Sequence, residues 1–583
     1  MAMSRPNDLC ATCRRAFTIL SGHSSHESYE AFREASQKCF ICYTVWNFTQ
    51  HHAQVWEAFP AEEWHSSDFF ERGIEHEMTN SVRVVGAFKD PISRTQRRFD
   101  FYFTPTTKNE LGNSLKVDRE TSSASTLELA HKWLQTCCSS HDKCGKSAST
   151  SSHWHPTRLV DIGVDGDTEW TLCVVSEDGI SPSVPYLTLS YRWGFTHSLK
   201  LLTSNMDNFR RGNPIRDLPR TFSDFVTVAR SFSIRYVWID SLCIIQDSVR
   251  DWQIESATMG DVFSKSVFTV AASASRDPDG GLFRERDPAF IQPGVVKAKF
   301  AKFAQGEFHV LDSTYWERNI FDGTLHTRGW VFQERMLSAR ILYFTKHQVM
   351  WECRTEHKCE AFPQRIPYHS SIKGRYAVVG DYELASPSQP GSLRHSTDTY
   401  HLWNELVSQY SACHLTKASD KLIAFHGIAQ FHRSLTGDEY VAGMWKSRLR
   451  QHMNWTVLKP LARPTESIAP SWSWASVGGE VQTPGYGHDT VFPFEILDVC
   501  RESREGRVSD ITWEGYLQLS GVLMPAICES VDEPFRILNF STHTTTIWFR
   551  RDSLGTLVVK GETVWCLLLR VESSHSPASP GNE

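Results

Sequence analysis

The sequence predicts an α/β protein with a parallel sheet at its core, and three apolar segments carry this prediction. They have the length of strands: Tyr186–Tyr191, Arg235–Ile239 and Ser266–Ala272. A segment with helical periodicity separates each strand from the next. Strands that alternate with helices over about ninety residues are typical of a parallel sheet with right-handed crossovers.

The two intervening helices have recognisable starts. The first is expected to begin near Pro219, because proline is favoured in the first turn of a helix. Apolar residues then recur at helical spacing: Phe222, Phe225, Val226, Ala229 and Phe232. The second helix is expected to run from Ser248 to about Ser264, because Ser248 and Asp251 resemble a capping box.

The length of 583 residues allows several structural units. We expect a cysteine-rich N-terminal region at 1–155, the α/β domain at 156–350 with its core at 185–335, a third region at 351–572 and a disordered tail at 573–583. The third region should begin with helices and become β-rich. A helical stripe is expected at Leu422, Phe425, Ile428 and Ala429, after a start signal at Ser419–Asp420. Strands are expected at 495–499, 516–521, 546–549 and 563–569.

Composition excludes several classes of protein. A formal net charge of −6 and a pI of about 6.5 leave no basic face, so a nucleic-acid partner is not expected. No segment has the ~20 apolar residues that a membrane span requires. The segment Met1–Cys10 lacks the apolar core of a secretory signal. The 15 cysteines are therefore expected to be reduced thiols, with the cytoplasm as the expected compartment and the nucleus as the alternative.

Two groups of cysteines have the spacing of metal ligands. Cys10-x-x-Cys13 and Cys39-x-x-Cys42 can together surround one tetrahedral zinc ion, and buried free thiols are the alternative. A second candidate group follows a helical segment: Cys137, Cys138, His141 and Cys144. Zinc at either group is expected to be structural, because four protein ligands leave no open position for chemistry.

The ends of the predicted strands carry the candidate ligand-binding residues, because ligands of open α/β sheets bind beyond the carboxyl ends of the strands. These residues are Ser190, Tyr191, Arg192, Trp193, Gly194, Asp240, Gln246 and Ser273–Ser275. Arg192 can hold a phosphate, Trp193 can stack on a ring, and Asp240 can accept a hydrogen bond from a hydroxyl. Gly194 lets a ligand approach the backbone. The sequence thus predicts a nucleotide-sized pocket, and a structural turn with a packed Trp193 is the alternative.

Glu255 is a candidate catalytic carboxylate. It lies on the same helical face as the apolar residues Trp252 and Met259, and an inward-facing carboxylate must be paired, hydrogen-bonded or functional. Burial raises the pKa of such a group, which suits acid–base chemistry. The alternative is a salt bridge to Arg328 or Arg335.

A dense polar and aromatic motif lies near the end of the domain: Arg328, Trp330, Gln333, Glu334 and Arg335. All of these except Glu334 are further ligand-binding candidates. As a helix, the motif places Arg328 and Arg335 on one side and Glu334 on another. Either arginine can close over an anionic ligand, and ion pairing to the core is the alternative. Cys243 lies in an apolar run, which predicts an inert buried thiol.

Several of these segments together resemble a known family. YLTLSYRWG at 186–194, YVWIDSLCIIQD at 236–247, TRGWVFQERMLS at 327–338 and PSWSWAS at 470–476 occur in the order and spacing of the heterokaryon-incompatibility (HET) family of filamentous fungi. The resemblance implies an effector of self/non-self recognition or programmed cell death, switched by self-association or by an incompatibility partner. It also implies a core similar to flavodoxin-like and Toll/interleukin-1-receptor (TIR) domains.

The TIR likeness brings a second functional hypothesis. Some TIR domains cleave NAD at the bond between nicotinamide and ribose, so NAD is a candidate substrate, with Glu255 or Glu285 as the catalytic carboxylate. Glu285 follows the third predicted strand, where such enzymes place theirs. The third hypothesis is a signalling or scaffold module without catalysis.

Overall fold

The computed structural model places most of the chain. It describes residues 9–13, 29–51, 68–71, 82–89, 96–106, 117–145, 154–194, 199–288, 291, 294–298, 306–312, 314–321, 323–366, 373–375, 397–462, 464, 466, 468–483, 491–501, 515–521, 523–530, 535–540, 546–550 and 563–567. The tail expected at 573–583 lies outside these residues.

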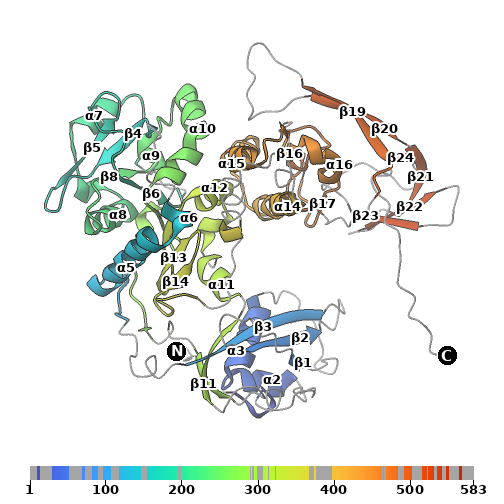
Figure 1. Ribbon diagram of the computed structural model, residues 1–583, viewed down its shortest axis with the longest axis horizontal. Coiled ribbons are helices and arrows are strands. Elements are labelled where there is room, and N and C mark those ends of the chain that lie inside the picture. Colours follow the sequence, from blue (N-terminus) through green and yellow to red (C-terminus); the bar gives the residue numbers. More distant parts are fainter. Residues whose placement is uncertain are drawn as a thin grey trace.

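The core of the α/β domain is a nine-stranded mixed sheet in the order β14-β13-β12-β9-β6-β8-β4-β5-β7 (Figure 1). Four neighbouring strands are parallel: β8 (Tyr236–Trp238), β6 (Tyr186–Ser190), β9 (Thr269–Ala271) and β12 (Arg340–Phe344). The predicted parallel α/β core is confirmed. Antiparallel strands extend it on both sides: β4 (Arg158–Asp161), β5 (Glu169–Val174), β7 (Asn213–Pro214), β13 (Val349–Cys353) and β14 (His357–Cys359).

The crossover helices begin where the sequence indicates. Helix α8 (Arg220–Ser231) follows Pro219 directly, and the five apolar residues predicted for its buried face are all buried. Helix α10 (Val249–Lys265) starts with the Ser248 hydroxyl accepting the Asp251 N–H at 3.2 Å, as the capping box predicts. Short helices α7 (Met206–Arg211) and α9 (Asp240–Cys243) complete the loops after β6 and β8.

Alternating side chains of β6 divide the domain into three layers, because successive residues of a strand point to opposite faces of a sheet. On one face, the Tyr186 hydroxyl donates to the Val262 carbonyl of α10 at 2.8 Å. On the other face, the Tyr191 ring lies edge-on to Phe222 of α8, with 5.0 Å between centroids. Helix α12 (Gly329–Leu337) lies beside α10, and α5 (Ala124–Ser140) lies beside α8.

The N-terminal elements include two helices and three strands: α2 (Tyr29–Ser36), α3 (Phe40–His51), β1 (Asp68–Glu71), β2 (Val82–Lys89) and β3 (Gln96–Pro105). Their sheet is completed by β10 (Gly294–Ala298) and β11 (Gly306–Asp312), in the antiparallel order β1-β2-β3-β11-β10. Phe103 of β3 faces Val310 of β11. This sheet could not be predicted from the sequence, because its pairing joins segments about two hundred residues apart. Helices α6 (Asp142–Gly145) and α11 (Tyr315–Phe321) flank the central sheet.

The third region starts with helices α14 (Thr397–Ser411), α15 (His426–Thr436) and α16 (Leu449–His452), packed around an aromatic core that includes Trp403, Phe425, Trp445 and Trp474. The predicted stripe at 422–429 is buried, but α15 begins at His426 because Ala418–Asp420 forms a 3-10 turn. The Trp474 indole N–H donates to the Gly443 carbonyl at 2.8 Å. Short strands complete this part: β15 (Tyr440–Val441), β16 (Met444–Trp445), β17 (Thr456–Val457) and β18 (Val481–Gln482).

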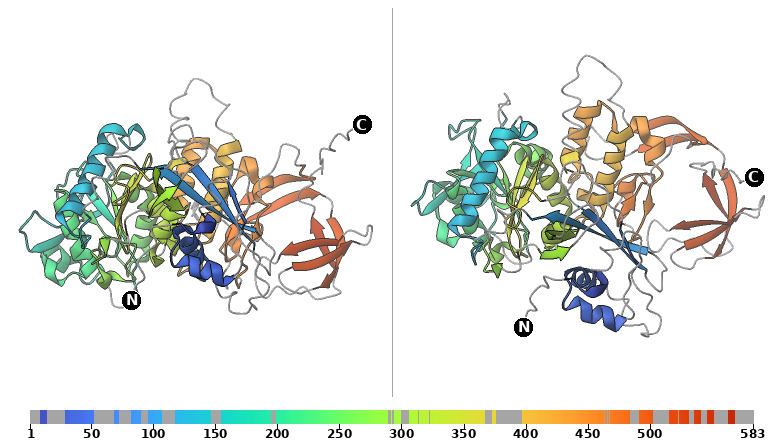
Figure 2. Two further views of the ribbon diagram at one scale, coloured as in Figure 1. Left: turned by 90° about the horizontal axis from the view of Figure 1, so that it is seen from below. Right: turned by 60° about the horizontal axis from the view of Figure 1, so that its bottom comes forward.

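The end of the described chain is β-rich, as predicted, and lies at the opposite end of the molecule from α5 and α8 (Figure 2). Its strands are β19 (Phe494–Arg501), β20 (Gly515–Gly521), β21 (Leu523–Ser530), β22 (Phe535–Phe540), β23 (Thr546–Arg550) and β24 (Thr563–Leu567). The four predicted strands correspond to β19, β20, β23 and β24. The sequence analysis missed β21 and β22.

Two glycines bring the third region against the central domain. A Cβ atom on Gly260 of α10 would lie 3.1 Å from the Gly427 Cα of α15, so the two helices approach closely. Phe332, Met336 and Leu337 of α12 belong to the same apolar cluster as α14 and α15. The helical part of the third region therefore covers the α10–α12 face of the sheet.

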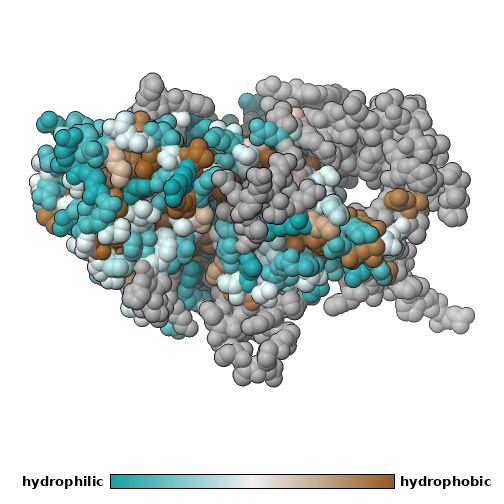
Figure 3. Space-filling view, turned by 90° about the horizontal axis from the view of Figure 1, so that it is seen from above, coloured by the Kyte–Doolittle hydropathy of each residue, from teal (hydrophilic) through white to brown (hydrophobic). Residues whose placement is uncertain are grey.

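Figure 3 shows one face of the molecule, on which hydrophilic residues of the α/β domain predominate and the hydrophobic residues form separate patches. Among the described residues, no helix is both long enough and apolar enough to cross a bilayer.

A buried ionic cluster joins α12 to the sheet. The Arg335 guanidinium donates two hydrogen bonds to the Glu352 carboxylate of β13, at 3.1 and 3.0 Å, and the Tyr343 hydroxyl donates a third. Burial alone would raise the pKa of Glu352, but the charges of Arg335 and Lys373 hold it well below its usual value. Arg335 thus contacts the sheet, as in the ion-pairing alternative, rather than the strand ends.

Replacing Glu352 with Gln should destabilise the fold strongly, because Arg335 would remain buried without its counter-charge. We expect the free energy of unfolding to fall by about 3 kcal/mol or more, measured by chemical denaturation. Glu128→Gln is the matched control, since Glu128 pairs with Lys132 on the exposed face of α5 and its loss should leave the melting temperature nearly unchanged. Equal stability of the two variants would contradict this role of Glu352.

Candidate functional site

The carboxyl ends of β6, β8 and β9 lie at one edge of the sheet, because the three strands are parallel and adjacent. We call this edge the strand-end rim, defined by residues 190–194, Asp240 and Ser273–Ser275. Gly194 has a φ of +72°, and a Cβ on it would lie 2.6 Å from the Asp277 Cβ. The loops after β6 and β9 therefore touch at Gly194. The prediction that a ligand approaches the backbone at Gly194 is wrong, because Asp277 occupies the space beside it.

Trp193 and Asp240 connect two of these loops. The Trp193 indole N–H donates to the Asp240 carboxylate at 2.6 Å, and the Lys200 ammonium lies 5.3 Å from the centre of the indole ring. The second Asp240 oxygen accepts the Ser241 N–H at 2.7 Å. Burial raises the pKa of Asp240, and the hydrogen bond from Trp193 opposes that effect. The predicted ligand-binding side chains of Trp193 and Asp240 thus both lie at the rim, and they are hydrogen-bonded to each other.

A second carboxyl group approaches the rim from α12. The Ser190 hydroxyl donates to the buried carboxyl of Glu334, and Arg328 donates to the Tyr191 carbonyl at 2.9 Å. Burial raises the pKa of Glu334 to about 7, although the hydrogen bond from Ser190 acts in the opposite direction. A carboxyl group with such a pKa can give or take a proton near neutral pH.

The sequence alone predicts that Glu334 lies on another side of its helix from Arg328 and Arg335 and is not a candidate ligand residue. The signal that could have placed it inside is the composition of α12, where Val331, Phe332, Met336 and Leu337 are all buried. A helix that is apolar nearly all round is buried, so its polar residues are buried with it.

Arg192 is the positively charged residue of the rim, and its guanidinium is available to bind a ligand. Its side chain is partly exposed and makes no hydrogen bond or ion pair with the described residues. A guanidinium in that state can bind an anionic group of a ligand.

Two hollows are lined in part by the loop after β9. One has a volume of about 360 Å³ and is lined by Ser273, Ala274, Arg276, Arg284, Asn319, Gly323, Thr324, Thr345 and Lys346. The other is more open, about 650 Å³, and its lining includes Lys200, Asn205, Arg220 and Asp279. Each hollow thus has two or more cations in its wall.

Three predicted ligand residues are engaged elsewhere in the fold. The Gln246 amide donates to the carbonyls of Asp240 and Ile244, at 3.1 and 2.9 Å. The Gln333 amide oxygen accepts the Gly427 N–H of α15 at 2.6 Å. The Trp330 indole donates to Asp420 at 3.3 Å. These contacts hold the loop after β8 and the third region in place.

The two predicted catalytic carboxylates do not meet at the rim. Glu255 is 2% exposed and lies 3.7 Å from the Arg158 guanidinium of β4, so its partner is Arg158 and not Arg328 or Arg335. Burial raises the pKa of Glu255, and Arg158 opposes that effect. Glu285 is exposed, and its backbone bridges to Glu120. Neither carboxylate makes a described contact with Arg192 or Asp240.

The thiol of Cys243 is buried, as predicted for an inert cysteine. Burial raises its pKa well above the ordinary thiol value.

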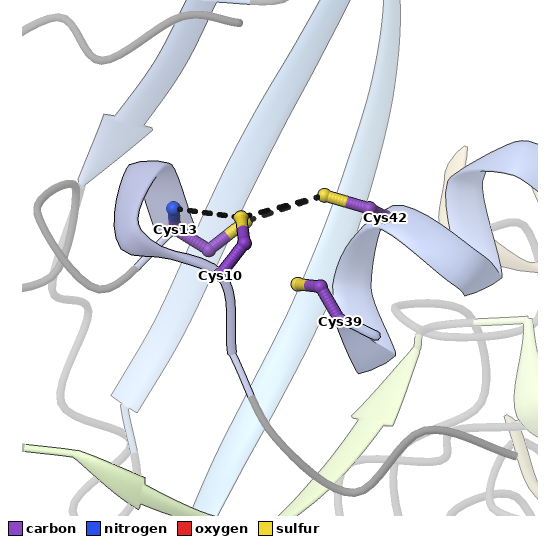
Figure 4. A group of neighbouring side chains, drawn as sticks. All are labelled: Cys10, Cys13, Cys39 and Cys42. Carbon is purple, nitrogen blue, oxygen red and sulfur yellow. Dashed lines mark hydrogen bonds between the residues drawn. The ribbon is translucent and has the colours of Figure 1, made fainter. Parts of the chain in front are cut away.

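The N-terminal cysteines come together as their spacing predicts (Figure 4). Cys10 and Cys13 lie on one turn, opposite Cys39 and Cys42 at the start of α3. The Cys42 sulfur is 3.8 Å from that of Cys10 and 3.7 Å from that of Cys13, and all four sulfurs lie within 4.8 Å of one another. Four sulfurs around one ion at about 2.3 Å would be about 3.8 Å apart, so these residues can hold a metal ion.

The second cysteine group differs from the predicted one. Cys137, His141 and Cys144 are joined by Cys353 of β13, and the four ligand atoms lie within 4.8 Å of one another. Cys138 is exposed and outside the group. Sequence spacing did not reveal Cys353, because 212 residues separate it from His141.

Comparison with known proteins adds one finding. Residues 186–334 match the model of the family described as heterokaryon incompatibility protein (HET). These residues form a HET domain. The matched span runs from the first residue of β6 to Glu334, so it contains the rim residues of β6, β8 and β9 as well as Arg328. Neither the curated proteins nor the solved structures gave a match.

The raised pKa of Glu334 predicts a pH dependence of stability. The folded protein favours the protonated form of the Glu334 carboxyl. The stability that the protonated carboxyl contributes is therefore fully present below the ordinary pKa of about 4.5, and it is lost as the pH rises to about 7. Glu334→Gln cannot ionise. Relative to that variant, the wild type should lose up to about 3 kcal/mol of unfolding free energy over this range. Denaturation curves at several pH values test this, and parallel profiles for the two proteins would contradict it.

Proposed function

We propose that this protein is an incompatibility or cell-death effector whose HET domain binds a nucleotide-sized anionic ligand at the strand-end rim. The HET match over residues 186–334 supports the first part. The group of cations in the wall of the smaller hollow, Arg276, Arg284 and Lys346, beside the rim residues Ser273 and Ala274, is the observation that carries the second. Self-association or an incompatibility partner would switch the activity, as the family resemblance implies. The expected compartment is the cytoplasm, with the nucleus as the alternative.

The order of the parallel strands supports a ligand at this place. In chain order β6, β8, β9 and β12 are the first to fourth parallel strands, and they are arranged 2-1-3-4. Flavodoxin-like sheets have this order, and they bind ligands where the first and third strands diverge. That position corresponds here to the space above β6 and β9. The likeness of the core to flavodoxin-like and TIR domains rests on the same order.

The positive charges of the rim and of the adjoining smaller hollow favour an anion. Arg192 lies on the β6 loop, Arg276 and Arg284 on the β9 loop, and Lys346 follows β12. Arg284 also donates to the Ser275 hydroxyl at 2.7 Å, which fixes its guanidinium at the edge of the smaller hollow. Phosphate groups are the anions that such clusters of arginine and lysine bind with directed hydrogen bonds.

NAD cleavage is the second candidate function, and the pKa of Glu334 favours it. Of the buried carboxyls near the strand ends, Glu334 has a pKa of about 7 and is hydrogen-bonded to the rim residue Ser190. It is therefore a better candidate than Glu255 or Glu285 to assist loss of nicotinamide. If the chain binds a ligand without releasing a product, the non-catalytic signalling module is the better description.

Binding of ADP-ribose, measured by calorimetry, tests the rim. Removing both exposed cations of the smaller hollow, in Arg276→Ala/Lys346→Ala, should weaken binding by about tenfold or more, because each contact to a charged group contributes ~1.5–3 kcal/mol. Lys132→Ala on α5 is the control and should bind as the wild type does. Undiminished binding by the double variant would place the ligand elsewhere.

Nicotinamide release from NAD tests the enzymatic candidate. Glu334→Gln should abolish release, while Glu285→Gln, which changes an exposed carboxylate, should retain it.

Induced expression in a filamentous fungus, followed by measurement of growth and viability, tests the effector role itself. Normal growth of the expressing strain, alone and with candidate partners, would count against that role.

A further inference from the structure

We propose that Cys137, His141, Cys144 and Cys353 bind one structural zinc ion, which fastens the α5–α6 segment to the edge of the nine-stranded sheet. The four ligand atoms lie within 4.8 Å of one another. The His141 Nδ1 atom is 3.5 Å from the Cys353 sulfur. Tetrahedral bonds of about 2.3 Å to sulfur and about 2.0 Å to nitrogen put those atoms roughly 3.5 Å apart.

Three of the ligands come from one continuous segment. Cys137 lies in the last turn of α5, His141 caps that helix, and Cys144 follows in α6. The chain leaves the helix at His141, whose backbone is extended (φ −107°, ψ 94°), and α6 then brings Cys144 back beside Cys137, so the three side chains lie together. Cys138 is turned by about 100° from Cys137 on a 3.6-residue helix, and it is exposed.

The outer nitrogen of His141 has the partner that a metal-bound histidine usually has. With Nδ1 toward Cys353, the Nε2 atom lies 3.2 Å from the Glu356 carboxylate. Metal-ligating histidines almost always donate their other ring N–H to a carboxylate, carbonyl or water, which fixes the tautomer. Glu356 also donates its backbone N–H to the Cys353 sulfur at 3.2 Å. The same residue thus supports two of the four ligands.

Arg340 supplies the charge that such a site requires. It is 2% exposed and donates to the Cys137 sulfur at 3.2 Å, the Cys144 carbonyl at 2.9 Å and the Val267 carbonyl at 3.2 Å. Among the described residues, no carboxylate forms an ion pair with this arginine. A buried cation needs a counter-charge.

Zinc with three thiolates and a neutral histidine provides that charge. Three negative sulfurs and one divalent ion leave one negative charge, which the Arg340 guanidinium balances. Four neutral side chains would leave the arginine uncompensated, and a disulfide between two of the cysteines would do the same. The ion would have no open coordination position, so its role is structural.

The zinc ion would join the end of α5 and helix α6 to strand β13. Cys353 ends β13, and α5 already contacts the adjoining segment through the Trp133 indole, which donates to the Pro363 carbonyl at 2.8 Å, and the Thr126 hydroxyl, which donates to Glu360 at 2.9 Å. Zinc would fix the other end of α5 to the same edge of the sheet.

Metal content of the purified full chain tests the proposal. Cys353→Ser should contain one zinc ion fewer per chain than the wild type, measured by mass spectrometry of the metal. Cys138→Ser is the matched control, because it removes the neighbouring exposed thiol, and it should keep the wild-type content. An unchanged zinc content in Cys353→Ser, or a loss in Cys138→Ser equal to that in Cys353→Ser, would overturn the ligand set.

If Cys353→Ser does not fold, a second variant tests the same four zinc ligands. His141→Cys should keep the metal, and with cobalt in place of zinc its visible spectrum should change from that of three sulfurs and one nitrogen toward that of four sulfurs. The N-terminal group contributes equally to both spectra, so the difference reports on this site alone. Identical cobalt spectra for His141→Cys and the wild type would refute the assignment.

Discussion

The parallel pairing of β6 with β8 on one side and β9 on the other is the constraint on which the rest of the HET domain depends. It places the carboxyl ends of three strands at one edge and sends the following chain to opposite sides of the sheet. Because β6 is central, its side chains have no route to solvent, and all five residues are buried. The polar groups of this strand must therefore find partners inside the protein, and Ser190 finds Glu334.

The helices and strands could be predicted because their signals lie in neighbouring residues. The arrangement of the candidate site depends on contacts between residues that are far apart in the sequence. The Ser248 cap, the apolar face of α8 and the apolar run of β6 involve neighbouring residues, so they could be recognised from spacing alone. The partners of the polar residues could not. Ser190 and Glu334 are 144 residues apart, and Arg158 meets Asp251 across 93 residues.

The same contrast applies to the candidate ligands. Trp193, Gly194 and Asp240 lie at the rim because each is in the loop that begins at a strand end, and strand ends can be recognised in the sequence. Glu255 was correctly placed inside the protein, but its cation comes from β4, an antiparallel strand that the alternating pattern of strands and helices did not predict. Charge pairs inside a sheet protein depend on strand order, which spacing along one helix does not contain.

The pairing of β3 with β11 has a consequence for how this chain can be divided. Strands β10 and β11 lie within the span that matches the HET family, yet the neighbour of β11 comes from the N-terminal region. A fragment cut at the start of β6 would leave the backbone N–H and carbonyl groups along one side of β11 without partners. Such open strands recruit other chains and promote aggregation, so the family-matched segment is not a self-sufficient folding unit in this protein.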